Sequence, residues 1–336
     1  MASPGSVAVE RAPRGRMPDF FIVGHAKCGT TALYEMLRAH PQIFMPDFKE
    51  PMYFARNWDA PPAAPGEPRR FEQTGRRAET RDDYLALFAP AGADQRVGEA
   101  STFYLWSQLA PARIAAAQPD ARIIAILREP ASFVHSLHMQ MLQNHAESER
   151  DLLRAIALEP SRREGRDIPP HAYWPEALMY TERVRYTEQL QRYHAAFGKE
   201  RVLVLIYDDF RSENEATVRR VLRFLEVDDT VPLRVVEANP SVRVRSTRLN
   251  TVVRDAREGR TAASRALRAG VRSLTSERIR AAVLYPLRRR LLYGEARGPD
   301  PAVIAELRRR FAGEVAALSD YLGRDLVSLW GYDRLT

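Results

Sequence analysis

Short apolar runs alternate with amphipathic stretches along the first two thirds of the chain. The apolar residues 20–23, bounded by Asp19 and Gly24, form the continuous run that is typical of a strand buried on both faces of a parallel sheet. Similar runs predict further strands at 96–100, 122–127 and 201–207. Apolar residues at helical spacing predict helices at 30–40, 81–88, 131–144, 180–197, 216–225 and 301–322. Strands that alternate with helices indicate a doubly wound α/β sheet.

Other segments carry less periodicity. Residues 57–80, which include four prolines, and residues 159–175 are predicted to be surface loops. Long loops of this kind in an α/β domain are often lids over a functional site. The C-terminal part, 240–336, has a helical pattern that is rich in arginine. We therefore expect a flexible tail at 1–18 and a single domain at 19–336, with two lid-like loops and a basic helical part.

The composition excludes several classes of protein. Of the 336 residues, 45% are hydrophobic and 28% are charged, which is typical of a soluble globular protein. A single cysteine, Cys28, excludes a disulfide framework, a four-cysteine zinc site and an iron–sulfur cluster. No stretch of about 18 apolar residues is available to cross a membrane, and the N-terminal tail lacks the apolar core of a secretory signal. These features predict a cytoplasmic protein.

The charge of the chain is unevenly distributed. The net charge is +8, but residues 240–336 contain 20 Arg and 10 acidic residues, so the remainder is close to neutral. Such a segment suits a small anion, an anionic membrane surface or nucleic acid. A solvated helical surface explains it better than nucleic acid, because no zinc finger, basic zipper or RNA-binding motif accompanies it. Only three of the 51 basic residues are lysines, Lys27, Lys49 and Lys199, and a lysine retained where arginine is the default indicates a need for a compact point charge.

The segment that follows the first predicted strand has the features of an anion-binding loop. Strand, glycine-containing loop and helix follow one another, so the N–H groups at the helix N-terminus point to the edge of the sheet, where an anion binds favourably. Gly24 and Gly29 have the spacing of the Walker A motif, but Thr30 stands where that motif has its lysine, and Lys27 lies earlier in the loop. An ordinary ATPase or GTPase is therefore disfavoured. A cysteine phosphatase loop is also disfavoured, because it needs an arginine where this chain has Tyr34.

The loop and several downstream segments resemble the sulfotransferases that use 3′-phosphoadenosine-5′-phosphosulfate. Residues 24–33 are similar to the family's loop G-x-x-K-[SGAC]-G-T-[TR]-x-L. Residues 40–43 and 49–54 resemble the H-P-x-[IV] and K-E-x-x-[FY]-F segments of the heparan-sulfate-type and related bacterial branch, as do 98–101 with Tyr104. The second hallmark of the family, R-x-P with a serine eight residues after the arginine, is found here as Arg128, Pro130 and Ser136.

The resemblance implies a fold and a reaction. The expected fold is a parallel sheet like that of P-loop NTPases, flanked by helices, with a helical C-terminal region. The expected activity is transfer of the sulfuryl group to a hydroxyl or amine, which is enzyme class EC 2.8.2. Lys27 would stabilise the leaving oxygen, and Glu50 would be the base that accepts the proton of the acceptor, with Glu99 as the alternative base. The residues that the resemblance assigns to the donor are Lys27, Cys28, Gly29, Thr30, Thr31, Arg128 and Ser136.

Physical considerations support the second hallmark. Arg128 ends a predicted buried strand, and Pro130 suits the first turn of the helix that follows. Ser136 would then lie roughly 9 Å along that helix at ~1.5 Å per residue. A guanidinium fork and a hydroxyl can hold one phosphate from two sides. The pair is therefore predicted to bind the 3′-phosphate that distinguishes the donor from its precursor.

The acceptor is less well defined by the sequence. Ala55 and Ala100 stand where some heparan-sulfate members carry Asp and Lys, which disfavours a long anionic polysaccharide. A small molecule, a glycolipid or a carbohydrate all remain open as acceptors, as do peripheral contact with a membrane and the oligomeric state; nucleic acid is not expected as a partner. Two other functions stay open, a small-molecule kinase with a variant phosphate loop and a non-catalytic protein that binds a nucleotide or another anion.

No metal is expected to take part in the reaction. His135, His138 and His145 lack the H-E-x-x-H spacing of a zinc site, so they are interpreted as surface or cleft residues. Asp208 and Asp209 follow a predicted strand as a Walker B carboxylate would, but this pattern is common, and we interpret them as a turn at the strand end.

Overall fold

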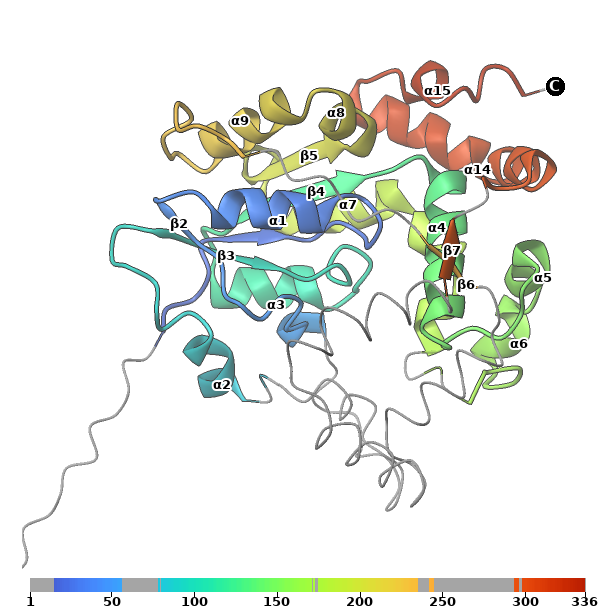
Figure 1. Cartoon of the computed structure of the whole chain (residues 1–336), viewed down its shortest axis with the longest axis horizontal. Coiled ribbons are helices and arrows are strands. Elements are labelled where there is room, and N and C mark those ends of the chain that lie inside the picture. The colour runs from blue at the N-terminus through green and yellow to red at the C-terminus, as the bar shows by residue number, and fades with distance from the viewer. Residues whose placement is uncertain are drawn as a thin grey trace, which may run out of the picture. The chain divides into compact units, whose positions relative to one another are not determined.

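The computed structural model of the protein describes residues 15–55, 78, 80–170, 172, 175–234, 242–244, 293–295 and 298–335 (Figure 1). The chain divides into two compact units, one made of Met1–Arg128 with Tyr186–Ala238 and the other of Glu129–Arg185 with Asn239–Thr336. Nearly all of the predicted tail and of the loop at 57–80, and much of the basic part at 240–336, lie outside the described residues. That residues 19–336 act as a single domain stays a prediction.

A parallel sheet forms the centre of the first unit. Its five strands have the order β2-β3-β1-β4-β5, and all four pairs of neighbours are parallel. The strands are β1 (Phe20–Ile22), β2 (Ile43–Phe44), β3 (Arg96–Ala100), β4 (Arg122–Leu127) and β5 (Val202–Ile206). The four strands predicted from apolar runs are confirmed. The edge strand β2 was not predicted, because two residues are too short to carry a periodic pattern.

The helices of the first unit follow from this strand order. The connection from β1 to β2 runs in the opposite direction to that from β3 to β4, so right-handed crossovers place α1 and α3 on opposite faces of the sheet. Helix α7 contacts α3, β4 and β5. The helices are α1 (Thr30–Arg38), α2 (Arg81–Ala86), α3 (Ala110–Ala117), α7 (Tyr186–Phe197), α8 (Tyr207–Ser212) and α9 (Asn214–Phe224).

Three details of the first unit differ from the sequence prediction. Helix α7 starts at Tyr186 rather than at residue 180; the predicted residues before it belong to the second unit and include a short 3-10 turn, Glu182–Val184. Helix α3 was not predicted at all. Asp208 and Asp209 do not form a turn at the end of β5; they lie in the first turn of α8, where acidic side chains favour the positive end of the helix dipole.

The second unit is mainly helical. Its helices are α4 (Pro130–Gln143), α5 (Leu152–Ala157), α6 (Glu159–Arg163), α14 (Pro301–Leu322) and α15 (Leu326–Leu329), and a small antiparallel pair joins β6 (Val242–Val244) to β7 (Tyr293–Glu295). The predicted helices at the start and end of this unit are confirmed, and α14 packs against α4 and α15. Glu129 ties them together: its carboxylate caps the N-terminus of α4 and accepts a hydrogen bond of 2.7 Å from Tyr332.

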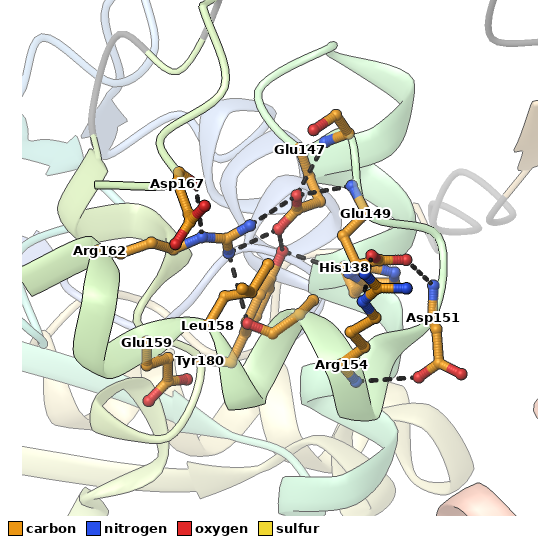
Figure 2. Close-up of polar contacts among 12 residues, drawn as sticks. His138, Glu147, Glu149, Asp151, Arg154, Leu158, Glu159, Arg162, Asp167 and Tyr180 are labelled. Carbon is orange, nitrogen blue, oxygen red and sulfur yellow. Dashed lines mark hydrogen bonds and ion pairs between the residues drawn. The ribbon is translucent and has the colours of Figure 1, made fainter. Parts of the chain in front are cut away.

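The predicted lid-like segment at 159–175 differs from a plain surface loop. It begins with helix α6, and Arg162 of this helix is buried (Figure 2). The guanidinium of Arg162 donates two hydrogen bonds, of 2.8 and 2.9 Å, to the carboxylate of Glu147, and both side chains are at most 1% exposed. Tyr180 donates a third hydrogen bond to Glu147. The weak periodicity of residues 159–175 predicted a loop. A sequence pattern does not reveal that two opposite charges are buried together as a pair.

Candidate active site

The loop between β1 and α1 requires glycine at both of its ends. A Cβ atom on Gly24 would lie 2.7 Å from the backbone nitrogen of Ile126, so only glycine allows the close approach to β4. Gly29 has a φ of 85° and its added Cβ would lie 3.0 Å from the ring of Phe210. Gly29 also precedes α1, and none of the described side chains caps this helix. The first N–H groups of α1 are therefore available to an anion at the carboxyl edge of the sheet.

Lys27 and Arg128 lie together at this edge. One guanidinium nitrogen of Arg128 donates a hydrogen bond of 2.9 Å to the backbone oxygen of Lys27. The guanidinium also lies over the ring of Tyr207, at 5.0 Å from the ring centre. Burial lowers the pKa of Lys27, and the positive charge of Arg128 lowers it further. Two cations that lie near each other, close to the N-terminus of a helix, suit a ligand with more than one negative charge.

The base predicted from the resemblance, Glu50, is anchored beside the same loop. Its backbone N–H donates a hydrogen bond of 3.0 Å to the oxygen of Ala100 at the end of β3. The side chain of Glu50 is 31% exposed, and its carboxylate lies 3.7 Å from the ammonium of Lys49. Lys49 in turn donates a hydrogen bond of 2.8 Å to the hydroxyl of Thr31 in the first turn of α1. A carboxylate and an ammonium thus border the anion-binding loop.

Lys49 is a candidate functional residue to which the sequence interpretation gave no role. Burial lowers the pKa of its ammonium, whereas the carboxylate of Glu50 raises it. The scarcity of lysine in this chain had marked Lys49 as a retained point charge, but it did not show which groups that charge contacts. The contact with Thr31, 18 residues earlier in the sequence, is visible only in the folded chain.

Glu99, the alternative base, is completely buried. Its carboxylate accepts hydrogen bonds from the hydroxyls of Tyr84, Tyr104 and Ser101, at 2.8, 2.9 and 2.5 Å. Burial raises the pKa of Glu99 to about 7, although the three hydrogen bonds oppose this shift. Its exposed fraction is 0%, so an acceptor molecule has no access to it in this conformation. The exposed carboxylate of Glu50 is the better placed of the two for contact with an acceptor.

The other predicted donor residues fall in different places. Cys28 and Thr30 are buried within the loop and the first turn of α1, next to Gly29, and Thr31 is exposed there. Ser136 belongs to the second unit, on α4, where it is 5% exposed and its hydroxyl oxygen has no hydrogen-bond partner among the described residues. Its predicted role beside Arg128 stays a prediction.

The histidines of α4 and the acidic residues do not form a metal site in the described part of the chain. No group of three or more His, Cys, Asp or Glu side chains gathers there in a way that would hold a metal ion. His138, predicted to be a surface or cleft residue, is instead buried: its ring nitrogens lie 3.2 Å from the hydroxyl of Tyr180 and 3.2 Å from the backbone oxygen of Arg150. That the reaction needs no metal stays a prediction.

Comparison with known proteins decides the family. The model of the sulfotransferase family matches residues 18–231, well over half of the chain. The chain belongs to the sulfotransferase family. A solved sulfotransferase from Alicyclobacillus acidocaldarius is similar in fold, with a TM-score of 0.65 and 25% identity over 94% of this chain and 98% of that one. The predicted resemblance and the predicted α/β fold of a P-loop-like sulfotransferase are thereby confirmed.

Several curated relatives of this sulfotransferase-family chain are similar over part of their length. Human carbohydrate sulfotransferase 15 is 26% identical over 63% of this chain and 44% of its own length. Human bifunctional heparan sulfate N-deacetylase/N-sulfotransferase 3 is 27% identical, and mouse heparan sulfate glucosamine 3-O-sulfotransferase 6 is 30% identical over 42% of this chain. The chain therefore spans less than half the length of these curated relatives.

The prediction of a cytoplasmic location is wrong. The carbohydrate and heparan sulfate sulfotransferases that this chain resembles are Golgi membrane enzymes, so absence of a signal pattern in the sequence was a poor guide to location. None of the helices in the described ranges has the length and apolar character of a membrane-spanning segment.

Proposed function

We propose that this member of the sulfotransferase family transfers the sulfuryl group of 3′-phosphoadenosine-5′-phosphosulfate to a hydroxyl or amine of an acceptor. One observation carries the proposal: the uncapped N-terminus of α1, with Lys27 in the loop before it, adjoins the pair Lys49–Glu50 through the hydroxyl of Thr31. This arrangement puts donors for an anion and a base for an acceptor at one edge of the sheet. An anion site alone would not need the exposed carboxylate.

The reaction requires one bond to form and one to break at sulfur. The acceptor oxygen or nitrogen attacks the sulfur, and the bond from sulfur to the bridging oxygen of the donor breaks, so that adenosine-3′,5′-bisphosphate leaves. Negative charge develops on the bridging oxygen, and the ammonium of Lys27 stabilises it there. The backbone N–H groups of Cys28, Gly29 and Thr30, with the hydroxyls of Thr30 and Thr31, hold the 5′-phosphate. The proton of the acceptor passes to the carboxylate of Glu50.

The residues proposed for the 3′-phosphate fit a phosphate chemically. Arg128 presents a guanidinium, which binds a phosphate through two parallel N–H groups. Ser136 carries a buried hydroxyl oxygen with no partner within the described chain, and buried polar atoms normally have one. A ligand oxygen that accepts from this hydroxyl would satisfy it. Each residue is described within its own unit, so their joint action on one phosphate is part of the proposal.

The relatives suggest a carbohydrate as the acceptor class. Their names specify carbohydrate and heparan sulfate sulfotransferases, one acting on glucosamine through oxygen and another at nitrogen. We therefore propose a carbohydrate, or the sugar of a glycolipid, ahead of a small aromatic alcohol. Ala55 and Ala100 carry no charge, so the proposed acceptor is not a highly anionic polysaccharide.

A transfer assay tests this function. The full chain is incubated with donor that carries radiolabelled sulfur, together with neutral oligosaccharides, glycolipids, phenols and amines, and labelled product is counted. Labelled product with wild type, and its loss with Glu50→Gln while the affinity for adenosine-3′,5′-bisphosphate is retained, is the expected result. Binding of the bisphosphate without transfer to any acceptor would point to a non-catalytic binding protein. Phosphoryl transfer from ATP, run in parallel, would point to a kinase.

A further inference from the structure

The loop that carries Glu50 has an unfavourable backbone conformation. Glu50 and Met52 have φ values of 62° and 54°, in the left-handed region that residues with a Cβ rarely adopt. Such a conformation is energetically unfavourable for a residue with a Cβ, and it persists only where the surroundings hold it. The exposed base therefore stands on a strained segment that needs external anchors.

Three hydrogen bonds anchor this loop to the end of β3 and the turn that follows. The N–H of Glu50 donates to the backbone oxygen of Ala100 at 3.0 Å. The N–H of Met52 donates to the hydroxyl of Ser101 at 3.0 Å. The N–H of Phe54 donates to the hydroxyl of Tyr104 at 3.2 Å. Two of the three groups that accept these hydrogen bonds are thus side-chain hydroxyls. A hydroxyl oxygen can accept from the loop only if its own hydrogen points elsewhere.

Glu99 determines where those hydrogens point. A hydroxyl has one hydrogen and two lone pairs. Ser101 donates its hydrogen to one oxygen of the Glu99 carboxylate, and Tyr104 donates its hydrogen to the other. The lone pairs of both hydroxyls are then free to accept from the N–H groups of the loop. Tyr84, on α2, also donates to Glu99 but has no hydrogen bond to residues 50–54 among those described.

We propose that Glu99 is the positioning residue of the catalytic base: its buried carboxylate orients the hydroxyls of Ser101 and Tyr104, which hold the strained loop and thereby place Glu50. The proposal rests on the proposed function, because it assumes that Glu50 is the base. It replaces the alternative in which Glu99 itself takes the proton of the acceptor.

The proposal has a consequence for pH. The carboxylate form accepts all three hydroxyl hydrogens, whereas a protonated Glu99 must donate to one of these oxygens. Where that oxygen belongs to Ser101 or Tyr104, the new hydrogen bond competes with an N–H of the loop. Burial raises the pKa of Glu99 to about 7. The hydroxyls of Tyr84, Tyr104 and Ser101 contact Glu99, and the phenols of Tyr34 and Tyr193 and the carboxylate of Glu50 also interact with its charge. Burial raises the pKa of all four phenols and so keeps them protonated. The negative charge of Glu50 raises the pKa of Glu99. Turnover should therefore rise as the pH passes upward through about 7.

The test compares Glu99→Gln with two matched variants. Glu99→Gln keeps the shape of the side chain but replaces one acceptor oxygen by a donor, so kcat should fall roughly 10- to 100-fold while the Kd for adenosine-3′,5′-bisphosphate stays unchanged. The rise in turnover near pH 7 should disappear. Tyr84→Phe removes one stabilising hydrogen bond to the carboxylate but keeps the ring that stacks on Tyr53 and meets Phe54 edge-on. It should therefore keep the high-pH turnover and shift the rise to higher pH. Ser101→Ala should lower kcat as Glu99→Gln does.

Two further measurements separate positioning from other roles. Because Glu99 acts through Glu50, adding Glu99→Gln to Glu50→Gln should cost little more activity than Glu50→Gln alone. Hydrogen exchange of the Met52 and Phe54 amides should speed up about tenfold or more in Glu99→Gln and Ser101→Ala, but not in Tyr84→Phe. The exchange result holds even if wild type transfers no sulfuryl group, which would defeat the proposed function alone. Unchanged exchange at these amides, or losses that multiply in the double variant, would overturn the positioning role.

Discussion

The buried pair Glu147–Arg162 allows a stability prediction with a defined size (Figure 2). Replacing Arg162 by Leu removes the guanidinium and leaves the Glu147 carboxylate, which has 0% exposure, without its counter-charge. Breaking a buried pair in this way costs about 3–5 kcal/mol, because an uncompensated charge stays in a medium of low polarity. Arg162 also donates to the backbone oxygen of Asp167 at 3.2 Å, and this hydrogen bond is lost as well.

The remaining partners of Glu147 place the expected cost at the lower end of that range. Its carboxylate keeps hydrogen bonds from the N–H groups of Ser148 and Glu149, at 2.8 and 2.9 Å, and from Tyr180. We therefore expect a loss of about 3 kcal/mol in the free energy of unfolding, equivalent to a roughly 150-fold change in the unfolding equilibrium. Replacing both charges by Leu should cost only about 1–2 kcal/mol, since no unpaired charge remains. The groups that then lose a partner, which are backbone groups and the hydroxyl of Tyr180, are all uncharged.

Urea unfolding of the full chain, followed by tryptophan fluorescence and circular dichroism, measures these values. Arg163→Leu is the matched control, because Arg163 is the next residue, is 46% exposed, and makes surface ion pairs worth about 1 kcal/mol or less. A loss for Arg162→Leu no larger than for Arg163→Leu, or a double variant as unstable as the sum of its single variants, would refute the buried-charge explanation.

The pH dependence of the same variant is a second part of this prediction. Burial raises the pKa of Glu147, but hydrogen bonds from Arg162 and from backbone N–H groups outweigh it, so the net pKa lies below the ordinary value of 4.5. A carboxyl with a depressed folded-state pKa contributes stability above its unfolded pKa and loses it as the pH falls through the folded value. Without Arg162, burial raises the pKa of Glu147, so in the variant the carboxylate takes up a proton earlier as the pH falls. The stability gap between wild type and Arg162→Leu should therefore be largest at neutral pH and narrow as the pH falls through the acidic range.

Three further predictions concern the proposed site. Lys27→Ala should lower kcat by ~10²-fold or more, and Lys27→Arg should also turn over slowly, because a planar guanidinium does not replace a compact ammonium. Steady-state kinetics measures both variants, and near-normal turnover of either would remove Lys27 from the mechanism. Wild type should bind adenosine-3′,5′-bisphosphate 30- to 1,000-fold (~2–4 kcal/mol) more tightly than the 5′-monophosphate, and Arg128→Ala should erase most of this preference, with a smaller loss for Ser136→Ala. Calorimetry with both nucleotides tests this. Equal losses of affinity for the two nucleotides would mean that Arg128 only supports the fold. Lys49→Met should lower kcat about tenfold or more while the protein keeps its unfolding midpoint, and turnover like that of wild type would show that the contact of Lys49 with Thr31 is not used.

Much of the fold and part of the candidate site follow from patterns within short stretches of the chain. The strands predicted at 96–100 and 122–127 match β3 and β4 residue for residue. After Arg122, β4 has the uninterrupted hydrophobic signature of a strand buried on both faces. The loop from Gly24 to Gly29 is equally local, since its glycine spacing, its lysine and the helix after it lie within a dozen residues. Family resemblance then attached chemical roles to Lys27 and Arg128 that spacing alone would have left as surface charges.

Contacts between distant residues are where local patterns were insufficient. The predicted loop at 159–175 contains a helix whose Arg162 is neutralised by Glu147, 15 residues earlier, and no periodicity marks such a pair. The short edge strand β2 pairs with β3 through Ile43 and Arg96, which lie more than 50 residues apart. Composition also gave the wrong location, because the similar carbohydrate and heparan sulfate sulfotransferases are Golgi membrane enzymes and composition does not indicate this.

The sequence by itself determined which residues can do chemistry, and the tertiary structure decided which of them are in a position to do it. The sequence offered both carboxylates as the base, Glu50 through its resemblance to the K-E-x-x-[FY]-F segment and Glu99 as the alternative near a predicted strand end, but it could not show which of them an acceptor can reach. Folding buries Glu99 completely beneath three hydroxyls, one of them from Tyr84 on another element, and leaves Glu50 exposed on a strained loop. The physical reason is that the accessibility, protonation and hydrogen bonding of a side chain depend on the groups packed around it, and those groups come from parts of the chain that meet only in the folded protein.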